Sequence, residues 1–333
     1  MTQLIDTYGR VHRDLRVSLT DRCNLRCNYC LPEEFSDWLP SEKLLTTDEL
    51  IRVIQVAVNC GITEVRLTGG EPLLRPDIVE IVSRISALEN APQLSLTTNG
   101  IKLASLAQRL KDAGLSRINV SLDTLRPDRF NELTHRDRFD DVQKGLKAAA
   151  DSGLAPIKIN SVLMPGINDD EASELLQWAI DEGFHLRFIE QMPLDAGGIW
   201  NRAKMITADD IFKDLEKSFS LTPVGARGSA PAEDFLVNGG PAKVGIIASV
   251  TRPFCGDCDR LRLTSDGQIR SCLFAKTETD LRAILRDQNL GSDEQNQKIA
   301  KLFGDTVADK LPGHGINNPD FIQPSRPMSA IGG

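Results

Sequence analysis

The sequence predicts an α/β protein: a partial (β/α)6 barrel of the TIM type, followed by a smaller C-terminal α+β domain. Segments with strand character alternate with amphipathic helical segments over residues 1–204, and such alternation implies parallel strands joined by right-handed helical crossovers. The alternation stops near Met205, which predicts a second domain over residues 205–310 and an extended tail over 311–333, lying on the surface or in a cleft. A chain of 333 residues with 41% hydrophobic content can bury one large core with a smaller domain attached.

Six β/α units are expected along the first part of the chain. The strands are predicted at residues 15–19, 64–68, 93–98, 117–122, 156–163 and 186–190, and the helices between them at 46–60, 76–88, 103–113, 140–151 and 170–182. Thr46 and Glu49 have the capping-box pattern that starts a helix, while Gly114, Gly153 and Gly183 stand at helix ends. Beyond Met205, a helix is predicted at 208–217 and a strand at 243–250.

Composition narrows the class of protein. The formal net charge of −8 argues against nucleic acid as the main partner. The N-terminus lacks a signal-peptide pattern and the chain lacks a membrane-spanning apolar run, so a cytoplasmic location is expected. The seven cysteines form two groups of three plus Cys60, which is a metal-binding distribution and not a disulfide framework. Cys60 ends a predicted helix and is interpreted as a small buried side chain.

The first group, Cys23, Cys27 and Cys30, follows the first strand with the spacing C-x3-C-x2-C. Three thiolates can bind three corners of a cubane iron–sulfur cluster and leave the fourth iron open for chemistry, whereas a closed zinc site needs four protein ligands. A zinc knuckle with a distant fourth ligand is the structural alternative, although no histidine lies nearby. The spacing therefore favours a cluster at the end of the first strand.

Polar residues gather where the predicted strands end. They are Arg16, Ser18, Arg66, Thr68, Thr97, Thr98, Asn99, Ser121, Asp123, Lys158, Asn160, Arg187 and Glu190. Singly, each is explained by solvent at a strand end, but barrels build their sites at this rim, next to the cysteine loop.

The Gly69-Gly70-Glu71-Pro72 turn follows the second strand. Its glycines would let a ligand lie against the backbone, and Glu71 can accept hydrogen bonds from an ammonium group. Alone, this turn is typical of an ordinary βα loop.

The second group is Cys255, Cys258 and Cys272. An Asp266-Gly267 turn between two β-like runs predicts a hairpin that brings Cys272 to within ligand reach of Cys258. With a two-residue loop, Cys272 would lie opposite Leu261, and the neighbouring arginines would face away from Cys272 unless a bulge intervenes. A zinc site with Asp257, Asp259 or His314 as fourth ligand is the alternative to a second cluster.

Long stretches of the chain resemble one family. The loop from Thr20 to Cys30, the stretch from Arg66 to Arg75, the segment from Phe254 to Thr264 with Cys272-Leu-Phe, and the terminal Gly332-Gly333 are similar to the GTP 3′,8-cyclase (MoaA) family of the radical S-adenosylmethionine superfamily. The resemblance runs nearly from end to end. Two positions depart from the family pattern: Leu31 stands where methionine is common and Asp259 where asparagine is common.

The resemblance implies an enzyme that converts GTP to 3′,8-cyclo-7,8-dihydro-GTP in the first step of molybdenum cofactor biosynthesis. It implies two [4Fe-4S] clusters, each held by one cysteine group, and S-adenosylmethionine. The implied contacts are Tyr29, Gly70, Ser121 and Met192 for S-adenosylmethionine, with Glu71 as a further candidate, and Arg16, Arg66, Thr97, Lys158, Arg260, Leu261 and Arg262 for GTP, with Arg187, Gly332 and Gly333 as further candidates. Core packing is the alternative for Met192. No protein acid or base is implied.

The cationic rim suits this interpretation because arginine binds phosphate in a bidentate way and lysine acts as a point charge. The resemblance also implies a one-electron donor of the flavodoxin type, a downstream pterin-forming enzyme, and a monomer or homodimer without nucleic acid or membrane partners. Two other classes stay open at this point: a radical enzyme that modifies peptides and carries an auxiliary cluster, and a non-enzymatic protein with two zinc sites.

Overall fold

A curved sheet of twelve strands forms the centre of the computed structural model across the residues that it describes, 3–198 and 200–332. The strands are β1 (Asp14–Ser18), β2 (Glu64–Thr68), β3 (Gln93–Thr98), β4 (Arg117–Ser121), β5 (Ile157–Ser161), β6 (His185–Ile189), β7 (Leu221–Pro223), β8 (Glu233–Val237), β9 (Lys243–Ile247), β10 (Arg260–Leu263), β11 (Gln268–Arg270) and β12 (Thr279–Asp280). Their order in the sheet is β12-β11-β10-β1-β2-β3-β4-β5-β6-β9-β8-β7. The run from β10 to β9 is parallel, and antiparallel strands extend it at both ends.

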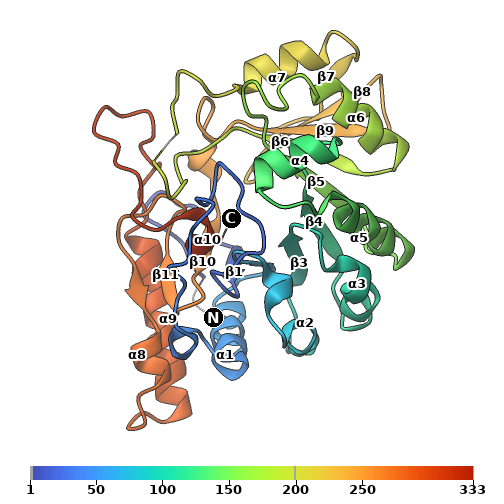
Figure 1. Ribbon diagram of the computed structural model, residues 1–333. Helices are drawn as coiled ribbons and strands as arrows, with labels where there is room; N and C mark the ends of the chain where they lie inside the picture. Colours follow the sequence, from blue (N-terminus) through green and yellow to red (C-terminus); the bar gives the residue numbers. More distant parts are fainter. Residues whose placement is uncertain (1–2, 199, 333) are drawn as a thin grey trace.

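Helices cover the outer side of this curved sheet (Figure 1). The helices of the described chain are α1 (Thr47–Asn59), α2 (Ile78–Ser86), α3 (Leu103–Asp112), α4 (Pro127–Thr134), α5 (Phe139–Asp151), α6 (Ala172–Asp181), α7 (Ala208–Leu215), α8 (Arg282–Leu285), α9 (Ser292–Ala308) and α10 (Met328–Ile331), with short 3-10 turns at Ser41–Lys43, Pro72–Leu74 and Cys255–Asp257. Helix α10 does not belong to the outer layer (Figure 1). In the described part of the chain, none of these helices combines the length and apolar character that crossing a membrane requires.

The predicted α/β barrel is confirmed. Each of the six predicted barrel strands and five intervening helices is present, and β2 and β3 have the predicted bounds. The capping box at Thr46 and Glu49 starts α1. Helices α4, α8, α9 and α10 and strands β7, β8 and β12 were not predicted from the sequence. In α9 only the stripe containing Ile299, Phe303 and Val307 is buried, so its apolar signal is diluted by charged neighbours.

Alternation along the strands separates a core face from a cavity face. In β1, Leu15 and Val17 are fully buried in the main hydrophobic core, whereas Arg16 between them lines an internal cavity. The same period places Leu261 of β10 in the core and Arg260 and Arg262 at the cavity. Much of the polar rim predicted from the sequence thus lines this cavity, whereas Ser18, Thr68, Thr98, Asn99 and Lys158 are not among its lining residues.

The C-terminal part of the chain builds both flanks of the barrel sheet. Strand β9 pairs in parallel with β6, and β10 pairs in parallel with β1 at the other end of the run. The tail packs on a second, smaller core, where Ile316 and Ile331 lie with Val250 and Phe274. Helix α10, drawn in dark red in Figure 1, lies near the middle of the molecule.

The predicted register of the β10–β11 hairpin is wrong by one residue. Arg262 pairs with Arg270, and the amide of Thr264 donates to the carbonyl of Gln268. The loop between Thr264 and Gln268 therefore has three residues, whereas two were predicted. Gly267 adopts a φ of +81°, which suits the left-handed last position of such a loop. The shift of one residue places Arg260 and Arg262 on the same face as Cys272, and it resolves the conflict that the two-residue loop created.

We expect Gly267→Ala to destabilise the fold. A Cβ there would lie 3.1 Å from Leu45 Cδ2 on a backbone of positive φ, which for a non-glycine residue costs about 1–3 kcal/mol. Thermal unfolding of the anaerobic protein measures the effect. Gly304→Ala in α9, where nothing lies within 4 Å of the new Cβ, is the matched control and should not lower the midpoint. Equal midpoints for the two variants would contradict this account.

Candidate functional site

A cavity of about 250 Å³ lies at the carboxyl ends of the parallel strands. Side chains from both cysteine-bearing regions and from most barrel strands meet there. The lining includes Arg16, Tyr29, Arg66, Thr97, Ser121, Asp123, Asn160, Arg187, Glu190, Met192, Cys255, Cys258, Arg260, Arg262 and Cys272. Of the residues predicted from the sequence, this cavity therefore gathers candidates for all three roles: metal, S-adenosylmethionine and GTP.

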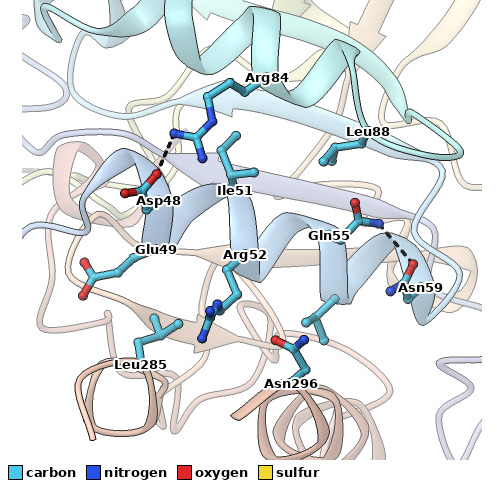
Figure 2. A pocket seen from close by; sticks show the side chains of 11 residues that line it. Asp48, Glu49, Ile51, Arg52, Gln55, Asn59, Arg84, Leu88, Leu285 and Asn296 are labelled. Atoms are coloured by element: carbon cyan, nitrogen blue, oxygen red, sulfur yellow. Dashed lines mark hydrogen bonds and ion pairs between the residues drawn. The ribbon is translucent and has the colours of Figure 1, made fainter. Parts of the chain in front are cut away.

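A larger groove of about 520 Å³ lies on the outer surface, beside α1 and α2. Figure 2 shows its lining, in which Arg84 pairs with Asp48 at 2.7 Å and Gln55 donates to Asn59 at 3.1 Å. It contains no cysteine and none of the predicted site residues. We therefore take the barrel cavity as the candidate site.

The C-terminal end of α4 holds the first cysteine loop through backbone hydrogen bonds. The backbone amides of Arg26 and Asn28 donate to the carbonyls of Thr134 and Leu133 at the end of that helix, each at 2.9 Å. Burial raises the pKa of Cys23 to about 11, and the negative charge of Glu71 adds to the effect. Burial raises the pKa of Cys30 to about 12, and a thiolate at Cys23 adds to it. Burial also raises the pKa of Cys27, followed in effect by the charge of Asp123 and by thiolates at Cys23 and Cys30. The three sulfur atoms therefore share one buried space that favours a bound cation.

The Gly69-Gly70 turn packs on this loop. A Cβ at Gly70 would lie 2.3 Å from the carbonyl oxygen of Arg22, and a Cβ at Gly69 would lie 2.5 Å from that of Thr20. The amide of Gly70 donates to Thr20 O at 2.7 Å. The sequence analysis attributed these glycines to a ligand lying on the backbone, but in the structure the cysteine loop itself occupies that space.

Glu71 connects the turn to the end of β3. Its buried carboxylate accepts hydrogen bonds from the amides of Leu73 and Asn99 and from the Thr98 hydroxyl, at 2.7–2.9 Å. Asn99 in turn donates to Asn24 Oδ1 at 2.7 Å. The sequence placed Asn99 at the polar rim without a role; its position directly after a buried strand is the signal that could have pointed to it.

Tyr29, which is partly buried, and Asp123, which is buried, form a hydrogen-bonded pair at the cavity wall. The Tyr29 hydroxyl donates to Asp123 Oδ2 at 2.7 Å, and the amide of Val162 donates to Oδ1 at 2.8 Å. Burial raises the pKa of Asp123 to about 6. Ser121 lines the cavity two residues before Asp123. Met192 lines the cavity and also packs on the second core.

The second cysteine group lines the same cavity as Tyr29 and Asp123, whereas Cys23, Cys27 and Cys30 are not among the residues that line it. Burial raises the pKa of Cys255 and Cys272. Burial opposes ionisation of Cys258 as well, but the positive charges of Lys310 and Arg260 outweigh it and lower the pKa of this thiol. This site is therefore surrounded by cations, unlike the first.

The arginines that line the cavity repel one another. Burial lowers the pKa of Arg16 to about 9, with the charge of Arg66 as the next cause, and burial lowers the pKa of Arg66 and Arg187 to about 10. Burial alone would raise the pKa of Asp14, but Arg16 and Arg66 lower it below its ordinary value. One buried carboxylate thus lies beneath several guanidinium groups, and the cavity suits a multiply charged anion.

Other predicted residues lie around this cluster. Arg187 donates to Asn119 Oδ1 and Asn160 Oδ1 at 2.9 and 2.7 Å, and Arg262 donates to the carbonyl of Gly332. Lys158 shares the inner face of β5 with Asn160 but is not among the residues that line the cavity. The Leu261 side chain is in the core, so only its backbone is available to a ligand.

The tail reaches the barrel strands. A Cβ at Gly332 would lie 2.5 Å from Thr68 Oγ1 and 3.0 Å from Ser18 Cβ. Gly333, the other tail candidate, lies outside the described residues. Asp259 is partly buried, and burial raises its pKa. Its carbonyl accepts from the amide of Arg13 at 3.2 Å.

The donor sets fit iron–sulfur clusters. Among the described residues, no three His, Cys, Asp or Glu side chains converge closely enough to hold a single metal ion. A cubane takes one thiolate at each of three separate irons, and each cysteine group offers three partly buried thiols that form no disulfide.

Two family profiles match consecutive parts of the chain: the Radical SAM superfamily over residues 17–179, and Molybdenum Cofactor Synthesis C over residues 184–316. GTP 3′,8-cyclase of Streptomyces coelicolor is 62% identical over 333 residues, covering 99% of this chain and 96% of the relative. GTP 3′,8-cyclase of Mycolicibacterium smegmatis is 53% identical, covering 99% and 92%.

Among solved structures, Streptococcus suis SuiB matches with a TM-score of 0.58 and 15% identity, covering 96% of this chain and 77% of SuiB. The same protein bound to S-adenosylmethionine matches with a TM-score of 0.57 and 15% identity, covering 96% and 77%. These likenesses concern the fold alone. The sequence identity to the relatives extends over nearly the whole chain, and the resemblance expected from the motifs is confirmed: the chain belongs to the GTP 3′,8-cyclase family of radical SAM proteins.

Proposed function

We propose that this chain converts GTP to 3′,8-cyclo-7,8-dihydro-GTP, the first step of molybdenum cofactor biosynthesis. The observation that carries the proposal is one cavity in which arginines from β1, β2, β6 and β10 lie beside the second cysteine group. A peptide-modifying enzyme has no need of this concentration of buried positive charge, whereas a triphosphate neutralises it.

In this proposal Cys23, Cys27 and Cys30 hold a [4Fe-4S] cluster, and S-adenosylmethionine binds beside it. When bound, these groups supply the radical that starts the reaction. Gly70 keeps the cysteine loop in place, while Glu71 fixes the turn through its bonds to Leu73 and Thr98. The part of the cavity that would hold S-adenosylmethionine is lined by Tyr29, Ser121 and Met192. Asp123 orients Tyr29 through their hydrogen bond.

A second cluster, held by Cys255, Cys258 and Cys272, would bind the guanine in the part of the cavity that these cysteines line. Arg16, Arg66 and Arg187 approach from the barrel side, with Thr97 between them, and Arg260 and Arg262 from the hairpin. Their side chains would bind and orient the triphosphate and exclude water from it. A flavodoxin-type electron donor and a downstream pterin-forming enzyme complete the proposed setting.

Anaerobic incubation of the reconstituted protein with GTP, S-adenosylmethionine and dithionite tests the activity. We expect 5′-deoxyadenosine and a cyclised purine nucleotide in equal amounts, both detected by mass spectrometry. ATP in place of GTP is the control. Formation of 5′-deoxyadenosine without a nucleotide product would contradict the proposed substrate.

Affinity for GTP should fall as the pH rises through about 8. Burial and the nearby charge of Arg187 lower the pKa of Lys158 to about 8, so in the free protein its ammonium is charged below this pH and neutral above it. Bound phosphate needs the charged form, and we expect up to roughly tenfold weaker binding between about pH 7.5 and 9, since one charge-assisted bond is lost. Anaerobic calorimetry measures it.

Lys158→Arg provides the comparison, because its guanidinium stays protonated throughout this range and the ionisation of GTP itself is common to both proteins. The variant should lose the part of the pH dependence that Lys158 causes near pH 8, while the part due to Arg16, whose pKa is about 9, remains in both proteins. An identical pH profile in both proteins would exclude Lys158 as a phosphate contact.

Gly70→Ala should weaken binding of S-adenosylmethionine by at least roughly tenfold. The added methyl group would collide with the carbonyls of Asp21 and Arg22 and displace the cysteine loop. Because both carbonyls are backbone groups, they cannot move away at a low cost in free energy. Equilibrium dialysis with labelled S-adenosylmethionine measures it. Gly291→Ala, which meets nothing within 4 Å, is the control and should bind normally. Normal binding by Gly70→Ala would refute the packing role.

A further inference from the structure

Lys310 is a buried lysine outside the cavity lining, directly after α9. Only 4% of its surface is exposed. Its ammonium donates to the carbonyl of Arg260 at 2.7 Å and to the carbonyl of Cys258 at 3.3 Å, and lies 3.8 Å from Cys258 Sγ. In the described part of the chain it forms no ion pair with a carboxylate.

A buried ammonium without a carboxylate is costly, and carbonyl oxygens offset only part of that cost. The anionic groups that act on Lys310 are the thiolates of Cys258 and Cys272, both of which raise its pKa against the larger effect of burial. The charge that compensates Lys310 therefore belongs to the cysteine site. This observation points to a net negative charge on the second cysteine group when it holds a cluster.

The cations on the two sides of this site are not equivalent. Arg260 and Arg262 line the cavity, where a bound triphosphate would neutralise them. Lys310 is not among the lining residues and lies near Arg10, which pairs with Asp6 and donates to the carbonyls of Cys255 and Leu311 at 2.6 and 2.8 Å. His12 also lies close, and burial lowers its pKa to about 4, so it adds no charge at neutral pH. Lys310 therefore remains a positive neighbour of the sulfur atoms whether or not substrate is bound.

We propose that Lys310 is a positioning residue that stabilises the reduced form of the second cluster and so raises its reduction potential. This inference rests on the proposed function, since it requires the second cluster. One electron added to the cluster brings one more negative charge next to the ammonium, with no bond formed or broken. Net charge and hydrogen bonds to sulfur are among the factors that set the potentials of such clusters.

The test is a redox titration with dithionite, followed by electron paramagnetic resonance on the full-length reconstituted protein. The second cluster's signal is identified by comparison with a variant in which Cys23, Cys27 and Cys30 are replaced by serine. In Lys310→Met we expect the reduction equilibrium to shift at least tenfold toward the oxidised form, which corresponds to a potential about 59 mV more negative for a one-electron couple.

Three further variants separate charge from structure. Lys310→Gln keeps a donor for the Arg260 carbonyl without the charge and should shift in the same direction, while Lys310→Arg should stay near the unmodified protein. Lys301→Met removes an equal charge from the exposed face of α9, where Lys301 pairs with Asp305 at 2.6 Å, and should leave the potential unchanged.

The outcomes are distinguishable. If the unmodified protein holds only one cluster, the proposed function fails. If it holds two and the potential of Lys310→Met equals that of Lys301→Met, the inference on Lys310 is overturned. If both uncharged variants lose the second cluster's iron while Lys310→Arg keeps it, Lys310 holds the cluster in place and does not tune it, which also overturns the inference.

Discussion

The architecture depends on keeping several like charges out of water in one place. At the cavity Arg187 is buried, Arg16 and Arg66 are partly buried, and the three repel one another. The charge of Asp14 offsets those of Arg16 and Arg66, and the charge of Asp234 offsets that of Arg187. Asparagine side chains on β4 and β5 hold Arg187, and the tail carbonyl of Gly332 accepts from Arg262. Uncompensated buried charge costs several kcal/mol per ion. The fold therefore carries an unfavourable interaction that a polyanionic substrate relieves, so binding and stability are coupled.

The barrel was predictable because its signals are local and repeated. Strands such as β2 and β3 are short apolar runs between turn residues, and the capping box of α1 fixes its start within a few residues. The two cysteine groups were predictable because the cysteines of each group lie close together in sequence or are joined by a hairpin. These features need no knowledge of tertiary structure.

Long-range packing decided what could not be predicted. The hairpin register depended on whether Gly267 closes a two- or a three-residue loop, a difference of one residue that reverses the face of Arg260. The space above Gly70 is filled by the loop around Arg22, which the sequence of the turn does not reveal. Lys310 has the sequence context of an ordinary cation at a helix end, and only tertiary structure buries it beside Cys258.

The placement of β9 and β10 has a consequence for how the chain can be divided. These two strands cover the outer edges of β6 and β1, so the first barrel-forming segment alone would leave both of its outermost strands with unpaired backbone groups. Exposed parallel edges invite association between chains. A fragment ending before α7 would for this reason be expected to aggregate, and the later part of the sequence acts as the closing half of the sheet that the earlier part begins.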